Sequence, residues 1–116
     1  MIDLGNRMNF PSIHPLCQSE RRRALMREAD VVLLLEVANP WGEFNSLSDP
    51  HKIHQQVGRK DVRIVNLSMQ DVYIRSNYQD FQRYQPVDLA INGDAQASLP
   101  ALITGSLLLE NFFGIP

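Results

Sequence analysis

The feature that most constrains this chain is an unbroken apolar run, Val31-Val32-Leu33-Leu34-Leu35, which continues through Glu36 to Val37. A run of this length that is rich in valine and does not alternate with polar residues is typical of a strand covered on both faces. Such strands occur in parallel sheets that are flanked by helices. We therefore expect a domain built around a parallel sheet that contains 31–37.

Two further segments are expected to extend this sheet. Residues 62–68 carry several β-branched side chains and predict a second parallel strand. Residues 88–92, closed by Gly93, predict a third. The short apolar stretch 2–4 is a candidate for a fourth strand.

Helices are expected between the first two strands and on either side of them. Ser19 is a favourable N-cap for a helix over 19–29. The pair Asp49-Pro50, followed by Gly58, predicts a second helix of about two turns over 50–57.

The last helix has two possible starts. Asp94 directly follows the third strand, whereas Pro100 is better tolerated if Ser98 is the N-cap. From either start the helix continues to about Phe112. The order of elements predicts an α/β fold, a partial Rossmann-like three-layer domain with a mainly parallel sheet of three to four strands.

Length and composition bound the class of protein. A chain of 116 residues favours a single domain over 1–116 and can bury about two thirds of its unfolded surface. Thirteen acidic and eleven basic residues give a net charge of −2, which argues against nucleic-acid binding. The single cysteine, Cys17, suits a reducing cytoplasm, and no apolar run is long enough to suggest a membrane partner.

Several residue clusters are given structural interpretations. His51 and His54 would share a face of the predicted 50–57 helix, with His14 and Cys17 as further ligands, but two imidazoles do not make a zinc site and no metal site is expected. Arg21-Arg22-Arg23 are spread around a helix and are interpreted as a solvated face.

The six glycines form neither a dinucleotide-binding turn nor a phosphate loop. Trp41 and Phe44 are interpreted as an aromatic plug that tethers a loop, with a stacking platform as the alternative. No complete catalytic set emerges, so no catalytic residue is assigned.

Polar residues gather where the predicted strands end. Ser68, Asp71, Asn92 and Asp94 follow the second and third strands or close them. Ligands of open α/β sheets bind outside the carboxyl ends of parallel strands, so these residues are candidates to line a pocket for a ribose or an adenine. Asp94 has the alternative role of a helix cap.

Three segments carry a resemblance to a known family. They are Ala29-Asp30-Val31-Val32-Leu33-Leu34-Leu35, Val62-Arg63-Ile64-Val65-Asn66-Leu67, and the most specific of them, Val87-Asp88-Leu89-Ala90-Ile91-Asn92-Gly93-Asp94-Ala95-Gln96-Ala97-Ser98-Leu99-Pro100-Ala101-Leu102. Together with Asn9-Phe10-Pro11-Ser12-Ile13-His14-Pro15-Leu16, they resemble the later half of the central domain of thiamine-diphosphate-dependent enzymes of the acetolactate synthase and benzoylformate decarboxylase type. The resemblance covers about 1–103, and the apolar tail from about 104 departs from it.

The resemblance implies a non-catalytic part of a larger enzyme. Thiamine diphosphate and magnesium are held in the family by two outer domains, through a glutamate and a Gly-Asp-Gly…Asn motif. Gly93-Asp94-Ala95 lacks the third glycine of that motif, and no cofactor is therefore expected in this chain. Some relatives bind FAD or ADP in the central domain, which makes Ser68, Asp71, Asn92 and Asp94 nucleotide-binding candidates.

The resemblance also bears on partners. The family's sheet has the order 3-2-1-4-5-6, so 31–37 would lack its inner neighbour and present an open apolar edge. We expect a homo-oligomer in which residues 1–5 or a second copy cover this edge and Leu107–Phe113 add to the contact, with the missing outer domains as further partners. Three functions stay open: a structural part of a 2-oxo-acid carboligase or decarboxylase, a small FAD- or ADP-binding module, and an interaction domain without a ligand.

Overall fold

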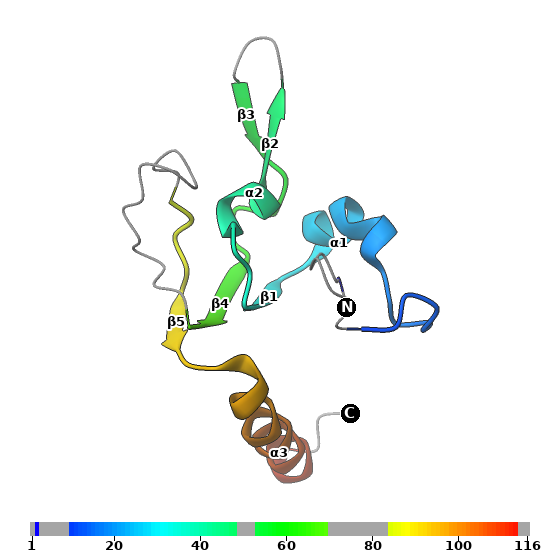
Figure 1. Cartoon of the computed structure of the whole chain (residues 1–116), viewed down its shortest axis with the longest axis vertical. Coiled ribbons are helices and arrows are strands. Elements are labelled where there is room, and N and C mark those ends of the chain that lie inside the picture. The colour runs from blue at the N-terminus through cyan, green and yellow to red at the C-terminus, as the bar shows by residue number, and fades with distance from the viewer. Residues whose placement is uncertain (1, 3–9, 49–52, 70–83, 114–116) are drawn as a thin grey trace. The chain divides into compact units, whose positions relative to one another are not determined.

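The computed structural model describes residue 2 and residues 10–48, 53–69 and 84–113 of the chain (Figure 1). The chain divides into two compact units. Met1–Asp30 and Phe44–Val62 form the first, which we call the hairpin unit. Val31–Glu43 and Arg63–Pro116 form the second, which we call the sheet unit.

The hairpin unit begins with a short 3-10 turn, η1 (Ser19–Arg21), that leads into helix α1 (Arg22–Glu28). The predicted helix is confirmed, but the assignment of Ser19 as its N-cap is wrong. Ser19 lies inside the 3-10 turn, and its hydroxyl oxygen is 3.6 Å from the Cys17 sulfur. No side-chain capping bond is formed at the start of either element.

The helix predicted over 50–57 is wrong in its described part. Ile53–Gln56 form strand β3, which pairs antiparallel with β2 (Asn45–Ser48). The Val57 N–H donates to the Phe44 carbonyl at 2.8 Å and closes the base of this hairpin. The helix is predicted only from the residues expected to begin and end it, Asp49-Pro50 and Gly58. Hydrogen bonding to a partner strand outweighs this local preference. Residues 49–52, which include the predicted start, lie outside the described residues.

Phe44 is the most buried large side chain of the hairpin unit, at 1% exposure. It ends the short helix α2 (Pro40–Phe44), which the sequence pattern does not predict. A Cβ atom built on Gly58 would lie 3.3 Å from the Phe44 ring and 3.5 Å from the Met26 carbonyl oxygen, so the backbone passes close to both. The predicted burial of Phe44 is confirmed.

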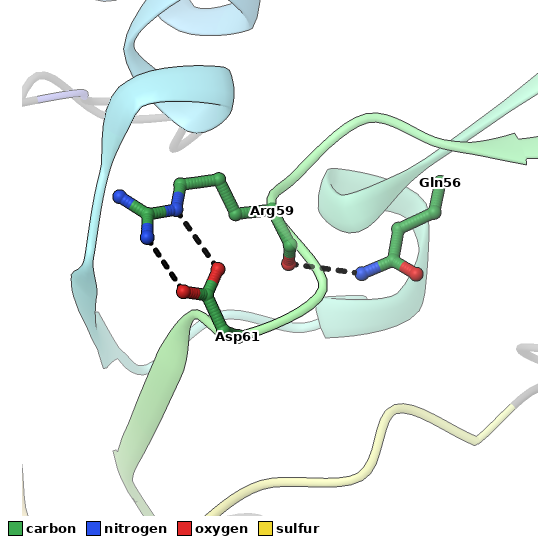
Figure 2. A network of polar contacts seen from close by, with 3 residues as sticks. All are labelled: Gln56, Arg59 and Asp61. Atoms are coloured by element: carbon green, nitrogen blue, oxygen red, sulfur yellow. Dashed lines mark hydrogen bonds and ion pairs between the residues drawn. The ribbon is translucent and has the colours of Figure 1, made fainter.

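A bidentate ion pair closes the turn after β3 (Figure 2). Arg59 Nε and Nη2 donate to the two carboxylate oxygens of Asp61 at 2.9 and 2.6 Å, and Gln56 Nε2 donates to the Arg59 carbonyl at 3.2 Å. The hydrogen bonds from Arg59 hold the pKa of Asp61 below its usual value. Both side chains face water, so the pair orders the turn but contributes little to stability.

The sheet unit contains a three-stranded, all-parallel sheet in the order β1-β4-β5. The strands are β1 (Val31–Leu35), β4 (Arg63–Ser68) and β5 (Leu89–Asn92). Each pairs parallel with its neighbour, with β4 in the centre. The predicted α/β class with a parallel sheet is confirmed, as are the three predicted strands.

Burial in this sheet is concentrated on its central strand. In β4, Ile64 and Leu67 are both buried, whereas every residue of β5 is exposed. In β1, Leu34 is buried, but Val31 and Leu33 on the opposite face are 58% and 43% exposed. The expectation that 31–37 is covered on both faces is therefore wrong. Among the described residues β1 has β4 as its only neighbour, and an apolar run does not specify what covers it.

Asp88 fixes the start of β5 against β4. Its carboxylate accepts the Ile64 N–H at 2.8 Å and Arg63 Nη1 at 2.7 Å, while the Asp88 N–H donates to the Ile64 carbonyl. The bond from the Ile64 N–H, followed by that from Arg63, lowers the pKa of Asp88.

The unit ends with helix α3 (Ala95–Phe113). The start at Asp94 is confirmed and the alternative start at Ser98 is wrong, because Ser98 already lies in the first turn and Pro100 is accommodated inside the helix. No helix among the described residues combines the length and apolarity needed to cross a membrane.

Candidate functional site

The three parallel strands end at one edge of the sheet. Because the strands run in the same direction, the residues that follow Leu35, Ser68 and Asn92 meet there. Ser68 is the register partner of Asn92. Helix α3 begins two residues after Gly93, so its N-terminus belongs to the same edge.

Glu36 is the residue that connects these parts. Its side chain accepts the Ser68 hydroxyl at 3.1 Å, the Met69 N–H at 3.2 Å and the Ala95 N–H at 3.3 Å. Its own N–H donates to the Leu67 carbonyl at 3.0 Å, which continues the bonding of β1 to β4 by one residue. A single carboxylate thus bonds to the ends of β4 and to the start of α3.

The backbone of Glu36 is strained. Its φ of 50° is the only positive value among the described non-glycine residues. A left-handed conformation costs a residue with a Cβ about 1–2 kcal/mol. The turn after β1 directs the Glu36 side chain back across the sheet edge, and the three bonds it accepts there offset this cost.

A second carboxylate lies at the same helix start. Asp94 Oδ1 accepts the N–H of Ala97 at 2.7 Å, which is the usual N-cap bond to the third residue of a helix. The helix-cap role of Asp94 is confirmed. With Glu36 on the Ala95 N–H, two carboxylates occupy donors that would otherwise attract an anion such as a phosphate.

The four predicted site residues differ in their exposure and in whether the structure describes them. Ser68 is 3% exposed and donates its hydroxyl to Glu36, whereas Asn92 and Asp94 are exposed at the same edge. Asp71 lies outside the described residues. The predicted gathering of polar residues at the strand ends therefore holds for the three described ones. The charges at this edge are negative.

Glu36 was missed as a site residue. The rule that identified Ser68 and Asn92, a polar side chain at the carboxyl end of a parallel strand, applies equally to Glu36. The sequence pattern does not single it out, because the apolar run continues beyond it to Val37. The structure ends β1 at Leu35.

Asn66, in the middle of β4, is a second residue that the pattern did not single out. It is 3% exposed, and its side-chain oxygen has no hydrogen-bond partner among the described residues. Buried acceptors without a partner are uncommon in proteins.

The metal-ligand candidates that the structure describes are not grouped into a site. His54 lies in β3 and not on a helix, and His51 lies outside the described residues. His14 Nδ1 accepts the Leu16 N–H at 3.1 Å, and its ring stands edge-on to Phe10. Within the described ranges, no three His, Cys, Asp or Glu side chains are grouped so that they could hold a metal ion.

The comparisons with protein-family models, with curated proteins and with solved structures each gave no match.

Proposed function

We propose that residues 1–103 are the later half of a thiamine-diphosphate-enzyme central domain, in which this part is structural and has no catalytic residue of its own. The observation that supports the proposal is the strand order. Three parallel strands in the order β1-β4-β5 match the last three of the 3-2-1-4-5-6 order that the resemblance implies. The parent reaction would be the conversion of a 2-oxo acid or a similar acyl donor, with the cofactor supplying the carbanion chemistry.

The carboxylates that the structure describes at this sheet edge are not placed to hold thiamine diphosphate and its magnesium ion. Asp94 is the one acidic residue whose sequence context resembles the metal motif, and its Oδ1 is engaged by the Ala97 N–H. Glu36 accepts the adjacent Ala95 N–H. We therefore assign the chain no step of the reaction. We propose that it is cytoplasmic and that the two outer domains of the enzyme are its partners.

Calorimetric titration of the chain with magnesium and thiamine diphosphate, FAD and ADP tests this assignment. We expect no binding of thiamine diphosphate, and binding of it by this chain alone would overturn the proposal. Micromolar binding of FAD or ADP that is lost in Asn92→Ala would instead favour the nucleotide-binding module.

A second experiment separates the enzyme part from an interaction domain. Sequencing the messenger RNA on both sides of the codons for 1–116 should reveal the two outer domains, in the same reading frame or in a neighbouring one. Flanking sequence that encodes neither would favour an interaction domain without a ligand.

A further inference from the structure

Helix α3 carries apolar side chains on every side of its axis, among only six polar or charged residues. Among its 19 residues only Glu110 is charged. A helix of this kind is normally buried. Yet six large apolar side chains of α3 are between 44% and 85% exposed: Leu102, Ile103, Leu107, Leu108, Leu109 and Phe112.

One face of α3 combines small and large side chains in a particular order. At about 100° per residue, five positions fall within an arc of about 100°. They are Ala101, Gly105, Leu108, Leu109 and Phe112. The two small residues lie in the first half of this face and the three large ones in the second half.

We propose that this face of α3 is the contact between two copies of the chain, whose α3 helices cross in antiparallel orientation. An antiparallel pair related by a two-fold axis near residue 106 places Leu108 of one copy opposite Gly105 of the other. The same axis places Phe112 opposite Ala101 and Leu109 at the level of Thr104. Leu108 and Phe112 then each face a small residue, so the two ends of the surface are complementary to each other.

The area and the charges of this face agree with a second copy as the occupant. Leu102 borders the face beside Leu109, about 20° outside the arc. With Leu102 included, the exposures of Leu102, Leu108, Leu109 and Phe112 give each copy roughly 500 Å², so a pair buries about 1,000 Å², the lower bound for a specific interface. Glu110 lies about 150° around the helix from the centre of the face, so the pairing brings no two like charges of α3 together.

The backbone at Gly105 provides a specific probe. A Cβ built there meets nothing within 4 Å in the single chain, so a larger side chain is tolerated by the chain itself. In the proposed pair the same side chain collides with Leu108 of the second copy. Gly105→Leu also removes a poor helix former, so any loss of association does not come from loss of the helix.

Sedimentation-equilibrium measurements on the full chain test the contact. We expect a dimer at micromolar concentration, with a dissociation constant raised at least tenfold by Leu108→Lys and by Gly105→Leu. Leu107→Lys and Gln96→Leu are the matched controls, because these residues lie about 150° and 170° around α3 from the centre of the face and should leave the dimer intact. Far-UV circular dichroism confirms that α3 is retained in each variant.

Three outcomes would overturn the proposal. One is a monomeric wild-type chain, including one that sediments with phosphatidylcholine vesicles, since its helix would then be covered by the chain itself or by lipid. Another is equal weakening by Leu107→Lys and Leu108→Lys. The third is a dimer that survives both Leu108→Lys and Gly105→Leu, since it would use another surface.

Discussion

At the scale of the residue, Glu36 shows how one side chain can stabilise the end of a sheet and the start of a helix together. Its carboxylate accepts the Ala95 N–H at the N-terminus of α3, where the helix dipole favours negative charge. Glu110 lies in the last turn of the same helix, where the dipole disfavours it. The same substitution at these two positions should therefore have different effects.

We expect Glu36→Gln to lower the free energy of unfolding by about 0.5–1 kcal/mol, because it removes the charge and keeps one acceptor oxygen. Glu110→Gln should leave it unchanged or raise it slightly. Urea unfolding followed by circular dichroism measures both. Equal losses in the two variants would show that the position of Glu36 at the helix start contributes nothing.

Asp88 leads to a prediction about pH. The Ile64 N–H and Arg63 depress its pKa in the folded chain, so the folded state binds a proton less readily than the unfolded state. The resulting stability is present above the ordinary pKa of Asp, about 4, and is lost as the pH falls through the lower, folded value. Urea midpoints measured from pH 6 to pH 2.5 should fall less steeply for Asp88→Asn than for the wild type. Identical slopes would contradict the assignment.

At the scale of the element, α3 contains a proline, Pro100, in its interior, where proline interrupts the backbone hydrogen bonding. Pro100 has no N–H to donate to the carbonyl of Gln96, and its ring crowds the preceding turn. The hydroxyl of Thr104 donates to the Pro100 carbonyl at 2.9 Å, and this bond does not replace the missing one.

We expect Pro100→Ala to raise the free energy of unfolding by about 1–2 kcal/mol, less than the full interior cost, because proline also restricts the unfolded chain. Helical ellipticity at 222 nm should increase with it. Thr104→Ala is the control and should change stability by less than about 0.5 kcal/mol. A Pro100→Ala variant that is no more stable than the wild type would place Pro100 in the first turn of the helix, where proline is tolerated.

The strands also show which parts of the fold the sequence predicts. The strands over 31–35, 63–68 and 89–92 are predictable because β-branched and apolar runs favour a strand from local composition alone. Strand β3 is not predictable in this way, because Ile53–Gln56 is mostly polar. It is stabilised by its pairing with β2, which the local sequence does not indicate. The exposure of Leu33 is not predictable either, because an apolar run does not indicate which element, if any, packs against it.

The candidate site was predictable to the same extent. The edge where Ser68, Asn92 and Asp94 gather follows from strand direction, which the sequence indicates. The hydrogen bonds at that edge depend on the left-handed turn at Glu36. The sequence does not predict this turn, because no glycine or asparagine stands at this position. Glutamate is not a residue that favours positive φ, so the turn is imposed by the bonds that Glu36 makes across the sheet.

At the scale of the whole molecule, we expect two different surfaces to control association. The proposed dimer uses α3, whereas β1 offers an edge with β4 on one side only among the described residues. Open apolar edges add strands from other chains without limit and so lead to aggregates. A net charge of −2 gives the chain little electrostatic protection against this.

We therefore expect Leu33→Glu to reduce aggregation and to leave the α3 dimer intact. Leu33 is 43% exposed in the middle of β1, so a carboxylate there reaches water and opposes the approach of a second strand. Ile13→Glu is the control: Ile13 is 95% exposed, and the substitution changes the net charge equally without touching an edge. Light scattering during heating at equal concentrations should fall for Leu33→Glu and change little for Ile13→Glu. An equal fall in both would mean that net charge, and not the edge of β1, limits the solubility of the chain.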